Sequence, residues 1–283
     1  MRGDARRLLA DRRAVAGLTI LALAALAAVL APLLAGDPIA QREIVATRFL
    51  PPFATDPLGA FHLLGTDRLG RDVWARLIYG ARVSLGVGTL AVLLSVLIGV
   101  AVGAAAGFWR GWVGTALLGL TDFALALPRV VLLLLLASLW RPSAGLVILV
   151  LGLTGWMPIA RLVYAEVRAL AGRPFVESAV GLGVPGPRIL VRHILPNALT
   201  PVIVAAALGL GNAILLEAGL SFLGLGVQPP TPSWGNLIAS GRDTLVNAPW
   251  VAAAPGVALV IVVVAATLLG DAVRDRLDPA ANG

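Results

Sequence analysis

Six long apolar runs constrain this chain more than any other feature of its sequence. An α-helix of about 20 apolar residues crosses the roughly 30 Å hydrocarbon core of a bilayer. The runs cover residues 14–36, 83–108, 113–140, 144–165, 199–224 and 251–270. Within a bilayer the backbone has to satisfy its own hydrogen bonds, so such runs fold as helices. The sequence therefore predicts an all-α polytopic membrane protein with six transmembrane helices.

The composition agrees with this class and excludes others. Of the 283 residues, 59% are hydrophobic and 13% are charged, which is too apolar for a soluble domain of this length. The formal net charge is +7, but the basic residues lie beside apolar runs. That distribution is typical of an orientation signal in a membrane protein. We therefore expect a lipid bilayer as the surroundings and no nucleic acid as a partner.

Two missing residue types exclude several chemistries. The chain has no cysteine, and all 22 of its basic residues are arginine. Without cysteine there is no thiolate metal site, and without lysine there is no P-loop lysine to bind nucleotide phosphates. The only histidines, His62 and His193, are far apart in the chain. We expect no metal and no cofactor in this chain, and no enzyme activity of its own.

Arginines near the start predict the orientation. Residues 1–13 contain five arginines and precede an apolar run that is longer than the core of a signal peptide. We expect an uncleaved first helix, with both termini in the cytoplasm after six crossings. Residues 37–82 and 227–249 then lie outside. In the first excursion, Trp74, Leu77 and Ile78 suit an amphipathic helix in the membrane interface; the second is rich in proline and predicts irregular structure.

The largest polar block between apolar runs is residues 166–197. Pro174 suits the first turn of a helix, and Gly183 suits the left-handed position after a helix end. Pro196 then interrupts the chain before the next apolar run. The block predicts a rigid unit of a helix, a turn and a second helix, over residues 174–182, 184–187 and 188–195.

The order and spacing of residues in this block resemble a known motif. Glu177-Ser178-Ala179, then Gly183, then Ile194-Leu195-Pro196 resembles the "EAA" loop in the membrane subunits of bacterial ABC importers. Together with Arg192 to Asn197 and the later segment 220–235, it is similar to the dipeptide/oligopeptide/nickel branch of that family, and to its second, C-type permease. The resemblance extends from about Leu64 to Pro279.

This resemblance implies a type I permease fold, with residues 1–63 forming an N-terminal helix and outer loop and residues 64–283 forming the transmembrane domain. It implies a permease subunit that provides half of a translocation path for peptides, with nickel or another small solute as the alternative. Its partners would be a second permease in a heterodimer, two ABC ATPase subunits that hold ATP and Mg, and an extracytoplasmic solute-binding protein. The location would be the cell inner membrane. The residues implied in coupling to the ATPase are Arg173, Glu177, Ser178, Ala179, Gly183 and Pro196.

Polar residues inside the apolar runs are candidates for a translocation path. A charged side chain at the centre of a bilayer costs roughly 2.5–3.5 kcal/mol on insertion scales, so it normally faces a partner or a water-filled cavity. Asp122 and Arg129 are two helical turns apart, so they share a face and can interact across a kink at Pro128. They either pack helices together or line the path. Asn212 has the same alternatives. Glu217 either lines the path, snorkels to the membrane interface or forms a helix-to-helix hydrogen bond.

Small residues predict a helix contact in the second run. Gly99, Gly103 and Gly107 recur every fourth residue, which lets another helix approach closely. That helix belongs either to a partner permease or to this chain.

Two other functions fit the sequence less well. A secondary transporter driven by an ion gradient would use Asp122 and Glu217 as relay carboxylates, but the two halves of the chain show no inverted repeat. An intramembrane hydrolase would need a Gly-x-Ser-x-Gly elbow, paired membrane aspartates or a His-Glu-x-x-His helix, and none is present.

Overall fold

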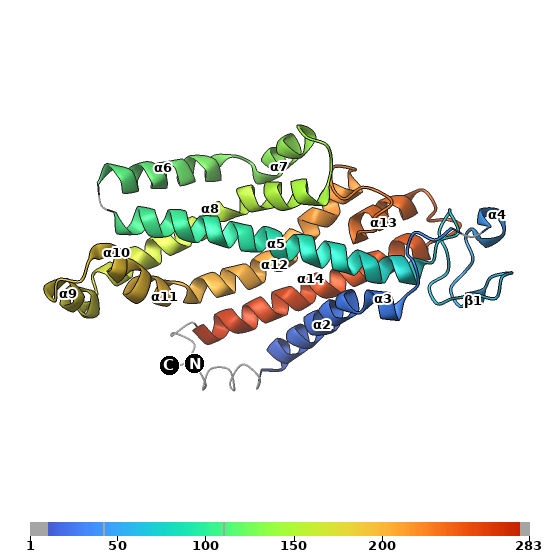
Figure 1. Cartoon of the computed structure of the whole chain (residues 1–283), viewed down its shortest axis with the longest axis horizontal. Coiled ribbons are helices and arrows are strands. Elements are labelled where there is room, and N and C mark those ends of the chain that lie inside the picture. Colours follow the sequence, from blue (N-terminus) through green and yellow to red (C-terminus); the bar gives the residue numbers. More distant parts are fainter. Residues whose placement is uncertain (1–10, 42, 110, 278–283) are drawn as a thin grey trace.

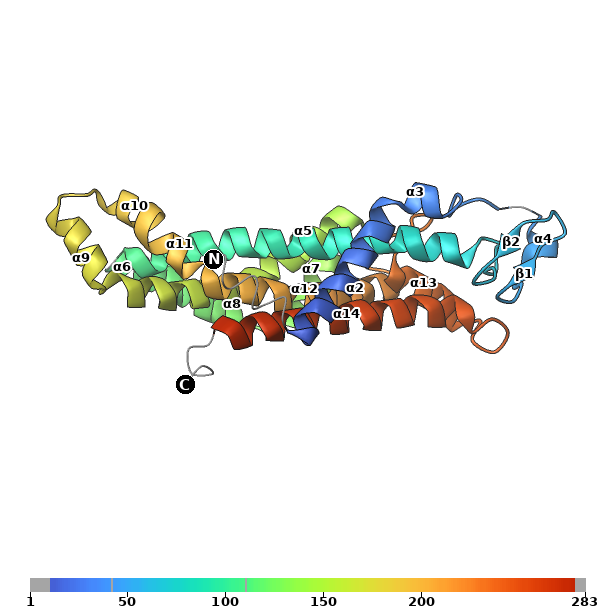
Figure 2. The same cartoon turned by 90° about the horizontal axis from the view of Figure 1, so that it is seen from below.

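The computed structural model describes residues 11–41, 43–109 and 111–277, and it is an elongated bundle of helices. The long helices lie side by side along one axis (Figures 1 and 2). Two groups of short elements mark the two ends. Helices α9 (Pro174–Gly181), α10 (Gly186–Ile189) and α11 (Leu195–Ala198) lie at one end. At the other end lie α4 (Ile44–Thr47), β1 (Ala54–Thr55) and β2 (Phe61–His62).

Among the described residues, five helices are long and apolar enough to cross a membrane. They are α2 (Arg12–Val29), α5 (Val73–Phe108), α8 (Ala144–Ala171), α12 (Thr200–Phe222) and α14 (Trp250–Leu277). The broken pair α6 (Trp112–Ala126) and α7 (Arg129–Ser138) makes a sixth crossing if it is counted as one span. The predicted helical membrane fold is confirmed.

Helix α5 begins outside the apolar run that predicted it. At a rise of 1.5 Å per residue its 36 residues extend about 54 Å, well beyond a 30 Å hydrocarbon core. Asp72 caps its first turn by accepting a hydrogen bond from the Ala75 N–H at 2.7 Å. The prediction of a separate interfacial helix around Trp74 is therefore wrong. Ile78 is buried because these turns pack against α13 and other outer elements.

The third span breaks rather than kinks. Its two helices meet at an angle of 87°, because Leu127, which precedes Pro128, is extended and Pro128 has no N–H to continue the helix. Asp122 and Arg129 thus lie on different helices, and the prediction that they share a face is wrong. Asp122 forms an ion pair with Arg161 of α8 instead, at 3.2 Å.

The outer excursion after α2 folds into a small cap on α5. It contains α3 (Ala31–Leu34), α4 (Ile44–Thr47) and the antiparallel pair β1 (Ala54–Thr55) and β2 (Phe61–His62). His62 links the hairpin to α5 through Asp72 at 2.6 Å. A hydrogen bond from the Ala60 N–H, helped by bonds from His62 and Leu58, outweighs burial and lowers the pKa of Asp56.

The second outer excursion contains a helix that the sequence analysis missed. Residues up to Ser233 are irregular as predicted, but α13 (Trp234–Arg242) follows directly. Ser233 and Asn236 form a capping box, which places the helix start at Trp234. The Ser-x-x-Asn spacing is the local signal for this helix.

Glu217 ties three helices together near this outer end. Its side chain is fully buried and accepts hydrogen bonds from Ser84 of α5 and Ser221 of α12, each at 2.7 Å. Ser84 in turn accepts one from the Trp234 N–H at 3.2 Å. Glu217 is thus a helix-to-helix hydrogen-bonding residue, joining α5, α12 and α13.

The three glycines of α5 face α8 of the same chain. A Cβ at Gly99 would lie 2.7 Å from the Ile159 Cβ, and one at Gly107 would lie 2.9 Å from the Val167 Cβ. A Cβ at Gly103 would collide with the carbonyl oxygen of Ala160. The two backbones therefore touch along this stripe, as small residues allow in membrane helices.

We predict that Gly103→Ala destabilises the protein. The added methyl group has no space, so we expect overpacking to cost about 1–3 kcal/mol, more than the gain of up to about 1 kcal/mol in helix propensity. The thermal unfolding midpoint of the purified protein measures the effect. Gly86→Ala is the matched control in the same helix, since its added Cβ meets nothing within 4 Å. Equal midpoints for the two variants would contradict the close contact.

Candidate functional site: the α9 knob and the central cavity

The polar block between α8 and α12 forms a compact protrusion at one end of the bundle (Figure 1). We refer to residues 173–198 as the knob. It contains α9 (Pro174–Gly181), α10 (Gly186–Ile189), the π-helix η1 (Leu190–Ile194) and α11 (Leu195–Ala198). Helix α9 agrees with the predicted first helix to within one residue at its end.

Gly183 terminates α9 in a Schellman motif. Its φ is +75°, a left-handed conformation that favours glycine. The Gly183 N–H donates to the Val180 carbonyl at 2.9 Å, and the Val184 N–H donates to the Ala179 carbonyl at 3.1 Å. These bonds satisfy the last carbonyls of the helix and fix the direction in which the chain leaves it.

The second half of the knob is more helical than predicted. The chain is helical from Gly186 to Ala198, apart from a change of type in η1, and continues into α12 after one turn residue, so Pro196 does not end the helix. Pro196 has no N–H and would clash with the Arg192 carbonyl in a regular α-helix. The wider π-turn, closed by the Leu195 N–H on the Leu190 carbonyl, accommodates the proline. Asn197 Nδ2 also donates to the His193 carbonyl at 2.7 Å.

The residues predicted for coupling divide into two groups. Arg173, Glu177, Ser178, Gly183 and Pro196 are exposed on the knob. Ala179 is only 7% exposed and packs with Ile189 and Ile194 inside the knob, so its small size serves the knob's own packing rather than contact with a groove on a partner. The reason is that α10 and η1 fold back over this face of α9.

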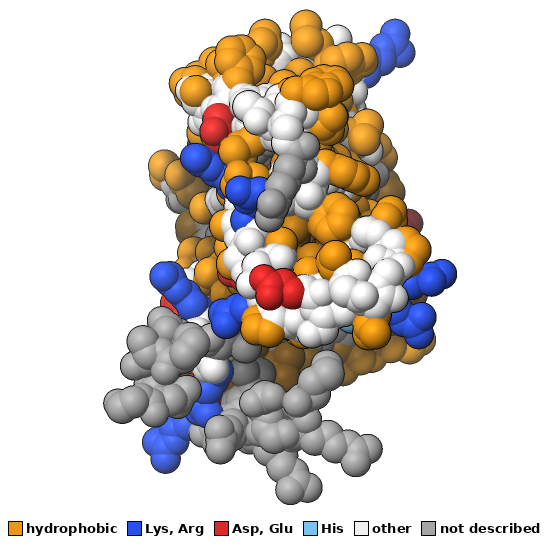
Figure 3. All heavy atoms as spheres, turned by 90° about the vertical axis from the view of Figure 1, so that its left-hand side faces the viewer, with side chains coloured by type: hydrophobic (Ala, Val, Ile, Leu, Met, Phe, Trp, Pro, Cys, Tyr) orange, Lys and Arg blue, Asp and Glu red, His pale blue; other side chains and the backbone are white. Residues whose placement is uncertain are grey.

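An apolar patch on the knob was not predicted. Leu182 is 83% exposed and Val180 is 60% exposed, and Phe175 and Val191 are also exposed. Figure 3, which looks onto this end of the molecule, shows hydrophobic side chains interspersed with arginines. The sequence signal for such a patch is a group of apolar side chains in a polar loop between membrane spans. Exposed apolar patches on a protein mark interaction sites, because contact with water does not favour them.

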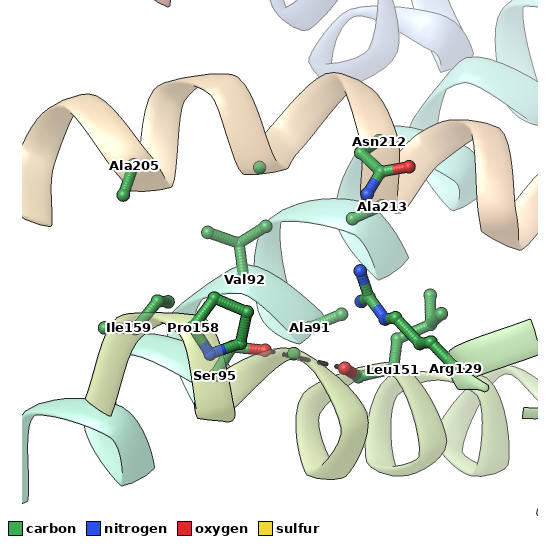
Figure 4. Close-up of a pocket in the computed structure, with 12 residues that line it drawn as sticks. Ala91, Val92, Ser95, Arg129, Leu151, Pro158, Ile159, Ala205, Asn212 and Ala213 are labelled. Carbon is green, nitrogen blue, oxygen red and sulfur yellow. Dashed lines mark hydrogen bonds between the residues drawn. The ribbon is translucent and has the colours of Figure 1, made fainter. Parts of the chain in front are cut away.

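A cavity of about 210 Å³ lies between the long helices (Figure 4). It is lined by α5, α8 and α12, and by Arg129 at the start of α7. Arg129 and Asn212 both line it, and the guanidinium group points towards Asn212 in Figure 4. Asp122 and Glu217 do not line it. Of the four polar residues considered for a path, the fold therefore brings two together.

The charged group in the cavity is the guanidinium of Arg129, which has no ion-pair partner among the described residues. No carboxylate in the described part of the chain lies within 4 Å of Arg129, since Asp122 pairs with Arg161. Within the described ranges, no group of three or more His, Cys, Asp or Glu side chains is placed to bind a metal ion.

Comparisons with known proteins agree on one family. Residues 97–283 match the family model described as "Binding-protein-dependent transport system inner membrane component", and residues 2–52 match the "N-terminal TM domain of oligopeptide transport permease C". A putative peptide transport system permease protein of Brucella abortus is 41% identical over 277 residues, which cover 97% of this chain and 90% of the relative. A dipeptide transport system permease protein of Alkalihalophilus pseudofirmus is 36% identical over 274 residues, covering 97% and 88%.

A solved structure shows the same fold. It is described as showing inward facing conformations of the MetNI methionine ABC transporter, and it superposes with a TM-score of 0.56 at 21% identity. The match covers 72% of this chain and 97% of that chain. From these matches, the chain belongs to the family of binding-protein-dependent transport system inner membrane components, the permease subunits of ABC importers.

Proposed function

We propose that this chain forms half of the translocation path of an ATP-driven peptide importer and is coupled to separate ATPase subunits through the knob. The observation that carries the proposal is that α8 leads into the knob and α12 leads out of it, and both helices line the central cavity. The names of the relatives, a peptide and a dipeptide permease, support peptides as the solute.

The knob is built to transmit force to the cavity. Val176 and Ala179 of α9 pack against Ile189 and Ile194, and this cluster continues into Val163 and Val167 of α8. Close-packed interiors have low compressibility and transmit displacement. A partner that moves α9 therefore moves the two helices that border the cavity.

The exposed face of α9 suits a protein partner. Leu182 and Val180 offer apolar area, and Glu177 in the first turn lies where the positive helix end favours a carboxylate. We infer that this face docks on an ATPase subunit, which would hold ATP and Mg. This chain has no lysine for a P-loop, so hydrolysis would take place on the partner.

The other partners follow from the family. We infer a second permease that completes the path, two ATPase subunits, and an external solute-binding protein that delivers the solute. The orientation in the inner membrane would place the knob and both termini in the cytoplasm.

An ion-gradient transporter fits the structure less well. Such a mechanism needs carboxylates that gain and lose ions along the path. Glu217 is fully buried among serine hydroxyls, and Asp122 is paired with Arg161; neither lines the cavity. Nickel or another small solute remains the alternative within the family, and the described residues offer no cluster of metal ligands in support of it.

We predict that Gly183→Val and Glu177→Arg each uncouple transport. Valine at φ +75° is strained by roughly 1–2 kcal/mol, which shifts the end of α9, and arginine reverses the charge on its docking face. ATPase activity, ATPase retention and uptake of a labelled dipeptide are measured in reconstituted complexes, and we expect uptake to be lost while the permease stays in the membrane. Gly172→Val is the control, because Gly172 also has free space around it but no positive φ. Wild-type uptake with both test variants would remove α9 from the mechanism.

We predict that Leu182→Asp weakens ATPase binding by about tenfold or more, because it places a charge in an apolar contact. The readout is the amount of ATPase subunit that co-purifies with the tagged permease after washes at one constant salt concentration. Val246→Asp is the matched control: Val246 is 95% exposed and lies in the loop between α13 and α14, outside the knob. Equal retention in the two variants would argue against docking through the apolar patch.

We predict that an impermeant thiol reagent labels Thr231→Cys but not Ser178→Cys in intact cells. Both positions are exposed, and the chain has no native cysteine to interfere. Inside-out vesicles stripped of peripheral subunits should give the reverse pattern. Labelling of Ser178→Cys alone in intact cells would invert the proposed orientation.

A further inference from the structure

Arg129 is placed at mid-depth in the bundle. The cavity that it enters is bordered by Ser95, Gly155 and Gly209, which lie near the middle of α5, α8 and α12 respectively. The break at Pro128 is what brings it there, because α7 starts at Arg129 and turns away from α6 by 87°. A cation therefore lies where the surrounding helices cross the centre of a membrane.

This cation has no counter-charge within the chain. In the parts of the sequence that the structure describes, Arg129 makes no ion pair and no hydrogen bond, and its Nε is shielded from solvent without a partner. An arginine at the membrane centre is costly unless it faces a cavity or an anion. Here it faces the cavity, and its guanidinium group is left free to bind a negatively charged group.

The rest of the lining leaves the guanidinium as the dominant polar group. Ser95 Oγ donates to the Gly152 carbonyl at 3.2 Å, so its proton is already engaged. The Asn212 side chain has no hydrogen bond within the described residues and supplies a neutral amide opposite Arg129. The other lining residues are apolar, and Ala91, Ala205 and Gly209 are small. The cavity thus favours an anionic ligand, but the described residues that line it include no further charged group that would select among the side chains of that ligand.

A guanidinium group recognises a carboxylate in particular, because its planar fork matches the two carboxylate oxygens with parallel hydrogen bonds. The free C-terminal carboxylate is the anionic group that peptides of different sequence share. At about 210 Å³ the cavity is smaller than the roughly 300–1,000 Å³ of sites that enclose whole small ligands. It has room for the end of a peptide rather than for all of it.

We propose that Arg129 binds the free C-terminal carboxylate of the peptide in transit, with Asn212 contacting the adjacent amide. The inference rests on the proposed function, since it needs a peptide in the path. The same chemistry has a second source, a carboxylate of the partner permease that would form a fixed ion pair with Arg129. The two sources differ in whether the solute's own end group matters.

The experiment compares a peptide with its C-terminal amide. Complete complexes are reconstituted in proteoliposomes with saturating loaded binding protein, and initial uptake rates of both forms are measured for wild type and Arg129→Gln. We expect wild type to carry the free acid faster, and Arg129→Gln to lower the free-acid to amide rate ratio by about tenfold. The ratio is measured within one preparation, so a lower yield of the variant does not affect it.

Two further variants keep the test decisive. Arg129→Lys retains the charge but loses the planar fork, so it should lower the ratio by less than Arg129→Gln, and it is the variant to use if the glutamine protein fails to assemble. Arg141→Gln removes the same charge from an exposed position outside the cavity and should leave the ratio at the wild-type value.

Each outcome has a distinct meaning. A loss of free-acid and amide uptake by the same factor in Arg129→Gln would overturn the proposal and favour an ion pair with the partner permease. An unchanged ratio at full activity would overturn it as well. A wild-type complex that carries neither peptide form would overturn the peptide function itself, and the inference with it.

Discussion

The contact between α5 and α8 holds the rest of the structure in place. Lipid tails are as apolar as leucine, so helices in a bilayer gain little from the hydrophobic effect and depend on close packing instead. Gly99, Gly103 and Gly107 provide it by letting the backbones touch. The two helices also connect the two ends of the bundle. Helix α5 starts at the outer cap and reaches the knob through Phe108, which packs against it, while α8 leads directly into α9.

Polar side chains supplement this packing by linking one helix to another. Glu217 joins α5, α12 and α13 through serine hydroxyls, and Asp122 joins α6 to α8 through Arg161. Both carboxylates are thus engaged in holding helices together. Arg129 is different, because the fold brings it to the cavity without a counter-charge from the described residues. The contrast separates two carboxylates that hold helices together from an arginine for which we propose a ligand.

Local sequence signals predicted those elements whose cause is local. The apolar runs predicted the spans, because the length of a membrane helix depends on its own residues. Pro174 and Gly183 predicted the start and end of α9, because the left-handed conformation of a glycine after a helix depends on neighbouring residues alone. The effect of Pro128 was predicted as a kink, but the structure has a break. Whether a proline kinks or breaks a helix depends on what the two segments pack against. Here Leu133 and Ala137 of α7 are buried in a cluster with residues of α8, which favours the break. The inward direction of Ala179 depends in the same way on how the second half of the knob folds back.

The π-helix η1 has a geometric consequence for the chain as a whole. A π-turn holds an extra residue without adding a turn, so each residue after it is rotated by about 100° relative to an uninterrupted α-helix. Between α10 and α12 this extra residue sets the angular phase of α12, and therefore which of its faces meets the cavity. Removing one residue from Leu190–Ile194 would keep the helix continuous but turn Gly209 and Asn212 away from the cavity. The length of this segment is thus as much a determinant of the path as the residues that line it.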